Sequence, residues 1–85
     1  MREEQYIVIV DDDKHQWGIA GPTADDTRWT DRVWAEQQRG RNIRCYTTPG
    51  TSEEDVARGA AERHKGTRVR PLSLPGWGPR PFERR

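Results

Sequence analysis

The sequence is poor in the residues that usually build a hydrophobic core. Isoleucine, leucine, valine and phenylalanine account for only 12 of the 85 residues, fewer than the roughly one-fifth at which disorder becomes a concern. The formal net charge of +1 is, however, too small for a typical disordered chain. Four tryptophans and two tyrosines compensate, because each enclosed aromatic side chain buries ~150–250 Å². We therefore expect a folded domain with an aromatic-dependent core that self-association completes.

Cysteine and long apolar runs are also scarce. Cys45 is the only cysteine, which excludes an intramolecular disulfide framework and a multi-cysteine metal site. No apolar run approaches the ~18 residues of a membrane helix, and the first residues, MREEQ, are acidic where a signal peptide is basic. These absences predict a cytoplasmic protein that does not enter a membrane. Lysine is rare beside arginine, 2 against 13, which is typical of a GC-rich coding genome, that of a high-GC host or its phage.

Charge is divided unevenly between the two halves of the chain. Residues 1–40 carry five basic and nine acidic side chains, a net charge of −4, whereas residues 41–85 carry ten basic and five acidic side chains, a net charge of +5. Such asymmetry accompanies nucleic-acid binding or head-to-tail self-association. It also arises from internal compensation within one fold, and the sequence leaves these explanations open.

The first half of the chain predicts a hairpin followed by a helix. Residues 6–10, YIVIV, are a continuous β-branched run typical of a central strand covered on both faces. A polar turn over 11–15 and alternation over 17–20 predict an antiparallel partner strand. A helix is expected from Ala24 to Arg39, with Thr23 as its cap and Gly40 beyond its end. Its apolar face is expected to hold four residues: Trp29, Thr30, Val33 and Trp34.

The second half predicts a strand, a helix and a further strand. Residues 42–48 alternate as a half-buried strand does, and Pro49-Gly50 is expected to break it. Thr51 and Glu54 have the spacing of a capping box, which opens a helix to about Lys65. Residues 67–74 form the last strand, placed at a sheet edge because Pro71 cannot donate a backbone hydrogen bond.

These elements predict one α/β (α+β) domain over residues 1–74 and a flexible tail rich in Pro, Gly and Arg over residues 75–85. The order β-β-α-β-α-β implies a compact mixed sheet of about four strands with two helices. Each strand that follows a helix should run parallel to the strand before that helix.

The sequence gives little support to an enzyme. Asp11, Asp12 and Asp13 resemble a solvated turn more than a calcium loop, which requires glycine and glutamate at fixed later positions. Cys45 has the position of a small buried residue in a strand, and His64 that of a residue that complements the C-terminal end of a helix. We therefore expect no catalytic residue, no cofactor and no metal ion.

A binding function is therefore expected, and the sequence offers two candidate binding surfaces. Basic side chains interleaved with an aromatic residue on neighbouring strands suit single-stranded nucleic acid; the candidates are Arg41, Arg44, Tyr46, Arg68 and Arg70. Tryptophans that exceed the capacity of a small core suit a protein interface; the candidates are Trp17, Trp34 and Trp77. Our leading hypothesis is a non-enzymatic interaction or regulatory module that self-associates as a homodimer and binds a protein partner. The alternative is a nucleic-acid-binding module that uses the basic second half.

Overall fold

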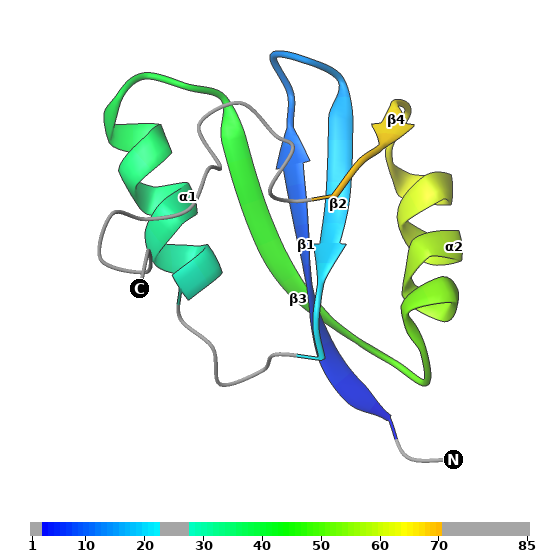
Figure 1. The fold of residues 1–85 in the computed structure, drawn as a ribbon. Coiled ribbons are helices and arrows are strands. Elements are labelled where there is room, and N and C mark those ends of the chain that lie inside the picture. The colour runs from blue at the N-terminus through cyan, green and yellow to red at the C-terminus, as the bar shows by residue number, and fades with distance from the viewer. Residues whose placement is uncertain (1–2, 23–27, 71–85) are drawn as a thin grey trace.

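The fold is a mixed four-stranded sheet with two helices, as the sequence predicts (Figure 1). The computed structural model describes residues 3–22 and 28–70. Within these ranges the chain forms β1 (Glu4–Asp11), β2 (Gln16–Ala20), α1 (Arg28–Gln38), β3 (Ile43–Gly50), α2 (Glu53–Arg63) and β4 (Thr67–Arg68). The strand order is β3-β1-β2-β4. In the described ranges neither helix is long and apolar enough to cross a membrane.

Strand β1 is central, which confirms the interpretation of its β-branched run. It pairs antiparallel with β2 on one side and with β3 on the other. Residues 6–11 are buried because both faces of an interior strand are covered when helices lie on both sides of a sheet. The hairpin of β1 and β2 is confirmed, with Val10 opposite Trp17.

The two helices cover opposite faces of the sheet (Figure 1). The connection through α1 leads from β2 past β1 to β3, and the connection through α2 leads back across the sheet to β4. Crossovers of the same hand that run in opposite directions place their helices on opposite faces. Strands β2, β3 and β4 all run antiparallel to β1, which confirms the predicted parallel relation across each helix.

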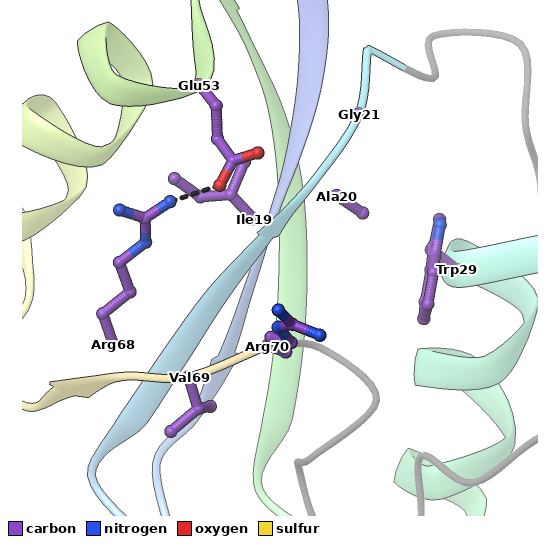
Figure 2. A pocket seen from close by; sticks show the side chains of 8 residues that line it. All are labelled: Ile19, Ala20, Gly21, Trp29, Glu53, Arg68, Val69 and Arg70. Carbon is purple, nitrogen blue, oxygen red and sulfur yellow. Dashed lines mark hydrogen bonds and ion pairs between the residues drawn. The ribbon is translucent and has the colours of Figure 1, made fainter.

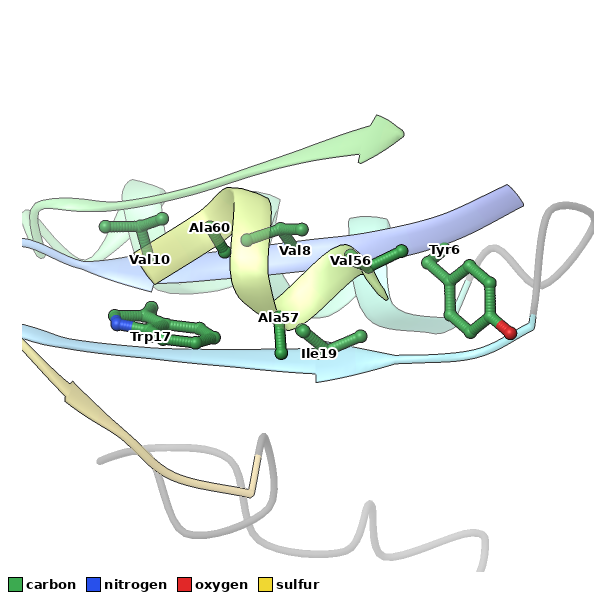
Figure 3. Close-up of a cluster of buried hydrophobic side chains, with 8 residues drawn as sticks. All are labelled: Tyr6, Val8, Val10, Trp17, Ile19, Val56, Ala57 and Ala60. Carbon is green, nitrogen blue, oxygen red and sulfur yellow. The ribbon is translucent and has the colours of Figure 1, made fainter. Parts of the chain in front are cut away.

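The core is divided by the sheet into two clusters. Figure 3 shows the cluster under α2, which joins side chains of β1, β2 and α2: Tyr6, Val8, Val10, Trp17, Ile19, Val56, Ala57 and Ala60. Small residues on α2 let the helix lie close to the strands, as its alanines suggest. The cluster under α1 consists of Ile7, Ile9, Ala20, Val33 and Ile43, with Trp29, Cys45 and Val69 packed against it.

The orientation of α1 was predicted only in part. Val33 is buried and Trp29 packs beside it, as expected. The next inward position is Glu36, which completes an i, i+4, i+7 stripe. Trp34 is 63% exposed, and Thr30 is exposed as well. The broad predicted face was therefore wrong on one side: the buried face of α1 extends from Val33 toward Glu36 and away from Trp34.

Three boundaries also differ from the prediction. Strand β3 continues through Pro49, which lies opposite Gln5; an edge strand tolerates proline because one side of it needs no donor. The cap of α2 is Ser52, whose side chain accepts from the backbone N–H of Asp55 at 3.1 Å, so the cap lies one residue after Thr51. Strand β4 ends at Arg68. The predicted residues 71–74, the start of the first helix over 23–27 and the tail 75–85 lie outside the described residues.

Candidate functional site

Arg41 is the centre of a buried ion network. Its Nη2 lies 2.9 Å from Asp11 Oδ2 and its Nη1 lies 3.3 Å from Glu36 Oε1. Asp11 is 0% exposed, Glu36 is 2% exposed, and the Arg41 side chain is 21% exposed. The other oxygen of Asp11 accepts from the backbone N–H groups of Asp13 and Lys14. This network fixes the β1–β2 turn to the α1–β3 connection.

The rest of the aspartate triplet is engaged in the same turn. Asp12 Oδ2 lies 2.9 Å from Arg44 Nε, and both side chains of this ion pair are exposed to solvent. Asp13 accepts from both the backbone and the side-chain nitrogen of Asn42. These hydrogen bonds lower the pKa of Asp13. In the described part of the chain, no three His, Cys, Asp or Glu side chains are grouped as a metal site.

The expected basic strand surface is not assembled by this fold. Arg44 lies on β3 and Arg68 on β4, and these strands are at opposite edges of the sheet. Arg68 pairs with Glu53 and, at 3.2 Å, with Glu54. Arg41 is held in the buried network described above. The structure therefore contradicts the expectation that these arginines line neighbouring strands, because β1 and β2 separate them.

Tyr46 lies on the α2 side of β3 and contacts the end of that helix. Its hydroxyl lies 2.8 Å from His64 Nε2, and the Arg63 guanidinium lies over its ring, 5.7 Å from the centroid. Burial, followed by the positive charge of Arg44, lowers the pKa of His64. Cys45 points to the other face of the sheet, where burial raises the pKa of its thiol. Cys45 and His64 are thus on opposite faces of the sheet, too far apart to act as a nucleophile and its base.

A pocket of about 650 Å³ lies at the edge of the sheet beside β2. Figure 2 shows its lining residues: Ile19, Ala20, Gly21, Trp29, Glu53, Arg68, Val69 and Arg70. Ala20 and Trp29 belong to the α1 side, whereas Ile19 belongs to the α2 side. The pocket, which we call the edge pocket, therefore wraps around the outer edge of β2.

Backbone groups of β2 face this edge pocket. The carbonyl of Trp17 accepts from the backbone N–H of Val69 at 2.8 Å, so Trp17 directs its backbone groups away from β1. Because alternate residues of a strand direct their backbone groups to the same side, Ile19 does so too. Among the described residues, no acceptor is present for the Ile19 N–H.

The three tryptophans expected at an interface are in different places. Trp17 is 4% exposed and belongs to the core, so it offers no apolar surface to a partner. Trp34, in contrast, is the one large apolar side chain among the described residues that is exposed to solvent. Trp77 lies outside the described residues. Trp29, which the sequence assigned to packing alone, is half-buried and lines the edge pocket.

Two of these features were not found by sequence reasoning. The edge pocket forms because β4 pairs with only the first part of β2. A local sequence pattern does not predict where the pairing of two strands ends. The buried network joins Asp11 and Arg41, 30 positions apart, which a single sequence does not connect. No family model matches the chain, and no curated protein or solved structure is significantly similar to it.

Proposed function

We propose that this protein is a non-enzymatic interaction module that binds an extended segment of a partner protein in the edge pocket. The observation that carries the proposal is the backbone N–H of Ile19 on β2, which donates to none of the described residues and faces a pocket of about 650 Å³. A strand added to an open sheet edge gains affinity from backbone hydrogen bonds and specificity from pockets for its side chains. The edge pocket offers both.

The chemistry of the lining sets the kind of segment that fits. Trp29 and Val69 supply apolar wall on the α1 side, and a half-buried tryptophan is the side chain most often found at the energetic centre of an interface. Arg70 makes no ion pair with the described residues, whereas Arg68 is paired with Glu53. An extended segment with an apolar side chain against Trp29 and a carboxylate near Arg70 is therefore complementary.

Self-association is the second part of the proposal, and Trp34 is its proposed contact. It is 63% exposed on the outer side of α1, far from the half-buried side of that helix. A protein of 85 residues buries only about 60–65% of the surface of its unfolded chain, so an additional apolar contact stabilises it appreciably. Light scattering at micromolar concentration should give a dimer mass for the protein and a monomer mass for Trp34→Ser.

The partner site is tested by selecting binders from a random peptide library on the immobilised full chain. We expect enriched peptides that combine an apolar residue with an acidic one. Their affinity should fall at least tenfold for Arg70→Glu, because the change replaces attraction by repulsion across the site. Arg58→Glu is the matched control, since Arg58 is exposed on α2 and does not line the edge pocket. Selection of no peptide, or equal loss in both variants, would contradict the proposal.

A further inference from the structure

A second pocket lies where the β1–β2 turn meets the C-terminal end of α2. Its volume is about 150 Å³, roughly that of five water molecules in the liquid. The residues that line it come from β1, the β1–β2 turn, β2, β3, the end of α2 and the two residues after it: Val10, Asp11, Asp12, His15, Gln16, Trp17, Arg44, Arg63, His64 and Lys65. We call it the turn pocket. It is separate from the edge pocket and plays no part in the proposed function.

Hydrogen-bond donors dominate the turn pocket. Arg63 and Lys65 have no carboxylate partner among the described residues. The two carboxylates in the lining are already engaged, Asp11 in the buried network and Asp12 with Arg44. Among the described residues, the lining thus has two cations without a carboxylate partner, whereas both of its carboxylates are paired with arginine.

Trp17 supplies an independent indication that an acceptor belongs here. Its indole nitrogen is buried and has no hydrogen-bond partner among the described residues, although the side chain is 4% exposed. An indole N–H is a donor only, and a buried donor without a partner costs ~1–3 kcal/mol. Figure 3 shows the nitrogen edge of the ring directed toward the Val10 end of the cluster, and Val10 also lines the turn pocket.

The state of His64 is consistent with a positive potential in this pocket. Its Nε2 contacts the Tyr46 hydroxyl, and the neutral tautomer that accepts from this hydroxyl carries its proton on Nδ1. Burial and the charges of Arg44 and Arg63 lower its pKa, while Asp12 opposes them. Burial is the largest of these causes, and it is the smaller contribution of the two guanidinium groups that favours an anion nearby.

We propose that the turn pocket binds a small oxyanion of the phosphate class, with one oxygen accepting from Trp17 Nε1 and the charge facing Arg63 and Lys65. An anion with several acceptor oxygens matches this lining better than a single carboxylate, because donors approach from the strand, the helix end and the turn.

The experiment is a titration of the 15N-labelled full chain with sodium phosphate, compared with acetate and chloride at equal ionic strength. The Trp17→Phe variant, which keeps the aromatic ring, identifies the Trp17 indole N–H resonance by its loss. Phosphate should shift this resonance in a saturable manner, and acetate and chloride should not. Phosphate should also raise the pKa of His64, because a nearby anion favours the imidazolium.

Two variants make the test specific. Arg63→Gln should weaken phosphate binding about tenfold, since a hydrogen bond to a charged group contributes ~1.5–3 kcal/mol and 1.4 kcal/mol corresponds to a factor of ten. Arg58→Gln removes the same charge from α2 outside the pocket and should leave the affinity unchanged. The proposal is overturned if the Trp17 indole resonance does not respond to phosphate, as expected if only water fills the pocket. An equal loss in both variants overturns it too, because it indicates general charge attraction.

Discussion

Replacing Arg41 by methionine should lower the free energy of unfolding more than replacing any other arginine that forms an ion pair with the described residues. The change leaves Asp11 and Glu36, both buried, without their shared counter-ion. Removing one partner of a buried ion pair costs ~3–5 kcal/mol, because the remaining charge stays desolvated. A domain of this length has a total stability of ~4–13 kcal/mol at 0.05–0.15 kcal/mol per residue. The variant therefore loses a large fraction of its stability.

The assay is thermal unfolding followed by circular dichroism, together with urea denaturation. At ~4–8 °C per kcal/mol for a domain of this size, a loss of ~3–5 kcal/mol should lower the melting temperature by roughly 12–40 °C. Arg68→Met is the control, since its pairs with Glu53 and Glu54 are solvent-exposed and such pairs contribute ~0–1 kcal/mol. Adding Asp11→Asn to Arg41→Met should recover part of the loss, because Asp11 then carries no buried charge without a counter-ion, whereas Glu36 keeps its ion pair with Arg39 at 3.5 Å. If Arg41→Met unfolds no earlier than Arg68→Met, the network is not the structural centre that we describe.

Three further predictions concern titration, reactivity and nucleic acid. The pKa of His64 is lowered in the folded protein, mainly by burial. Below about pH 6.5 the unfolded chain therefore binds more protons at this residue than the folded chain does. The free energy of unfolding should fall as the pH decreases from 6.5 toward the pKa of the folded state. Urea midpoints at pH 7.5 and 5.5 should differ more for the wild type than for His64→Gln. Cys45, whose thiol pKa is raised by burial, should react with iodoacetamide more slowly than free cysteine at pH 8. Finally, fluorescence anisotropy at physiological salt should show no DNA or RNA complex tighter than the ~1–100 µM non-specific range, and a sub-micromolar complex would favour the nucleic-acid hypothesis instead.

The elements that local patterns specify were predicted correctly. The β-branched run of β1 requires cover on both faces, and its place inside the sheet follows from that requirement. The two connections through helices determined the direction of β3 and β4, since a strand joined through a helix returns in parallel. Even so, the prediction for α1 failed at Glu36, because a pattern of apolar residues does not identify a carboxylate that is buried through its ion pairs with Arg39 and Arg41.

The candidate sites were harder to predict because they depend on which strands become neighbours. Arg44 and Arg68 look alike in the sequence, but the strand order β3-β1-β2-β4 places them at opposite edges. Likewise, nothing local distinguishes Trp17 in the core from Trp34 on the surface, although both occur within apolar patterns. The edge pocket arises from the short pairing of β4 with β2, which is a property of the assembled sheet.

Hydrogen exchange at the Ile19 backbone amide tests the proposed function most directly. No described residue accepts from this N–H, so in the free protein it should exchange faster than the amide of Gly18, which pairs with β1. Adding a peptide selected on the full chain should slow exchange at Ile19 strongly, because the added strand provides the missing acceptor. A peptide that binds at saturation while exchange at Ile19 stays unchanged would contradict the account.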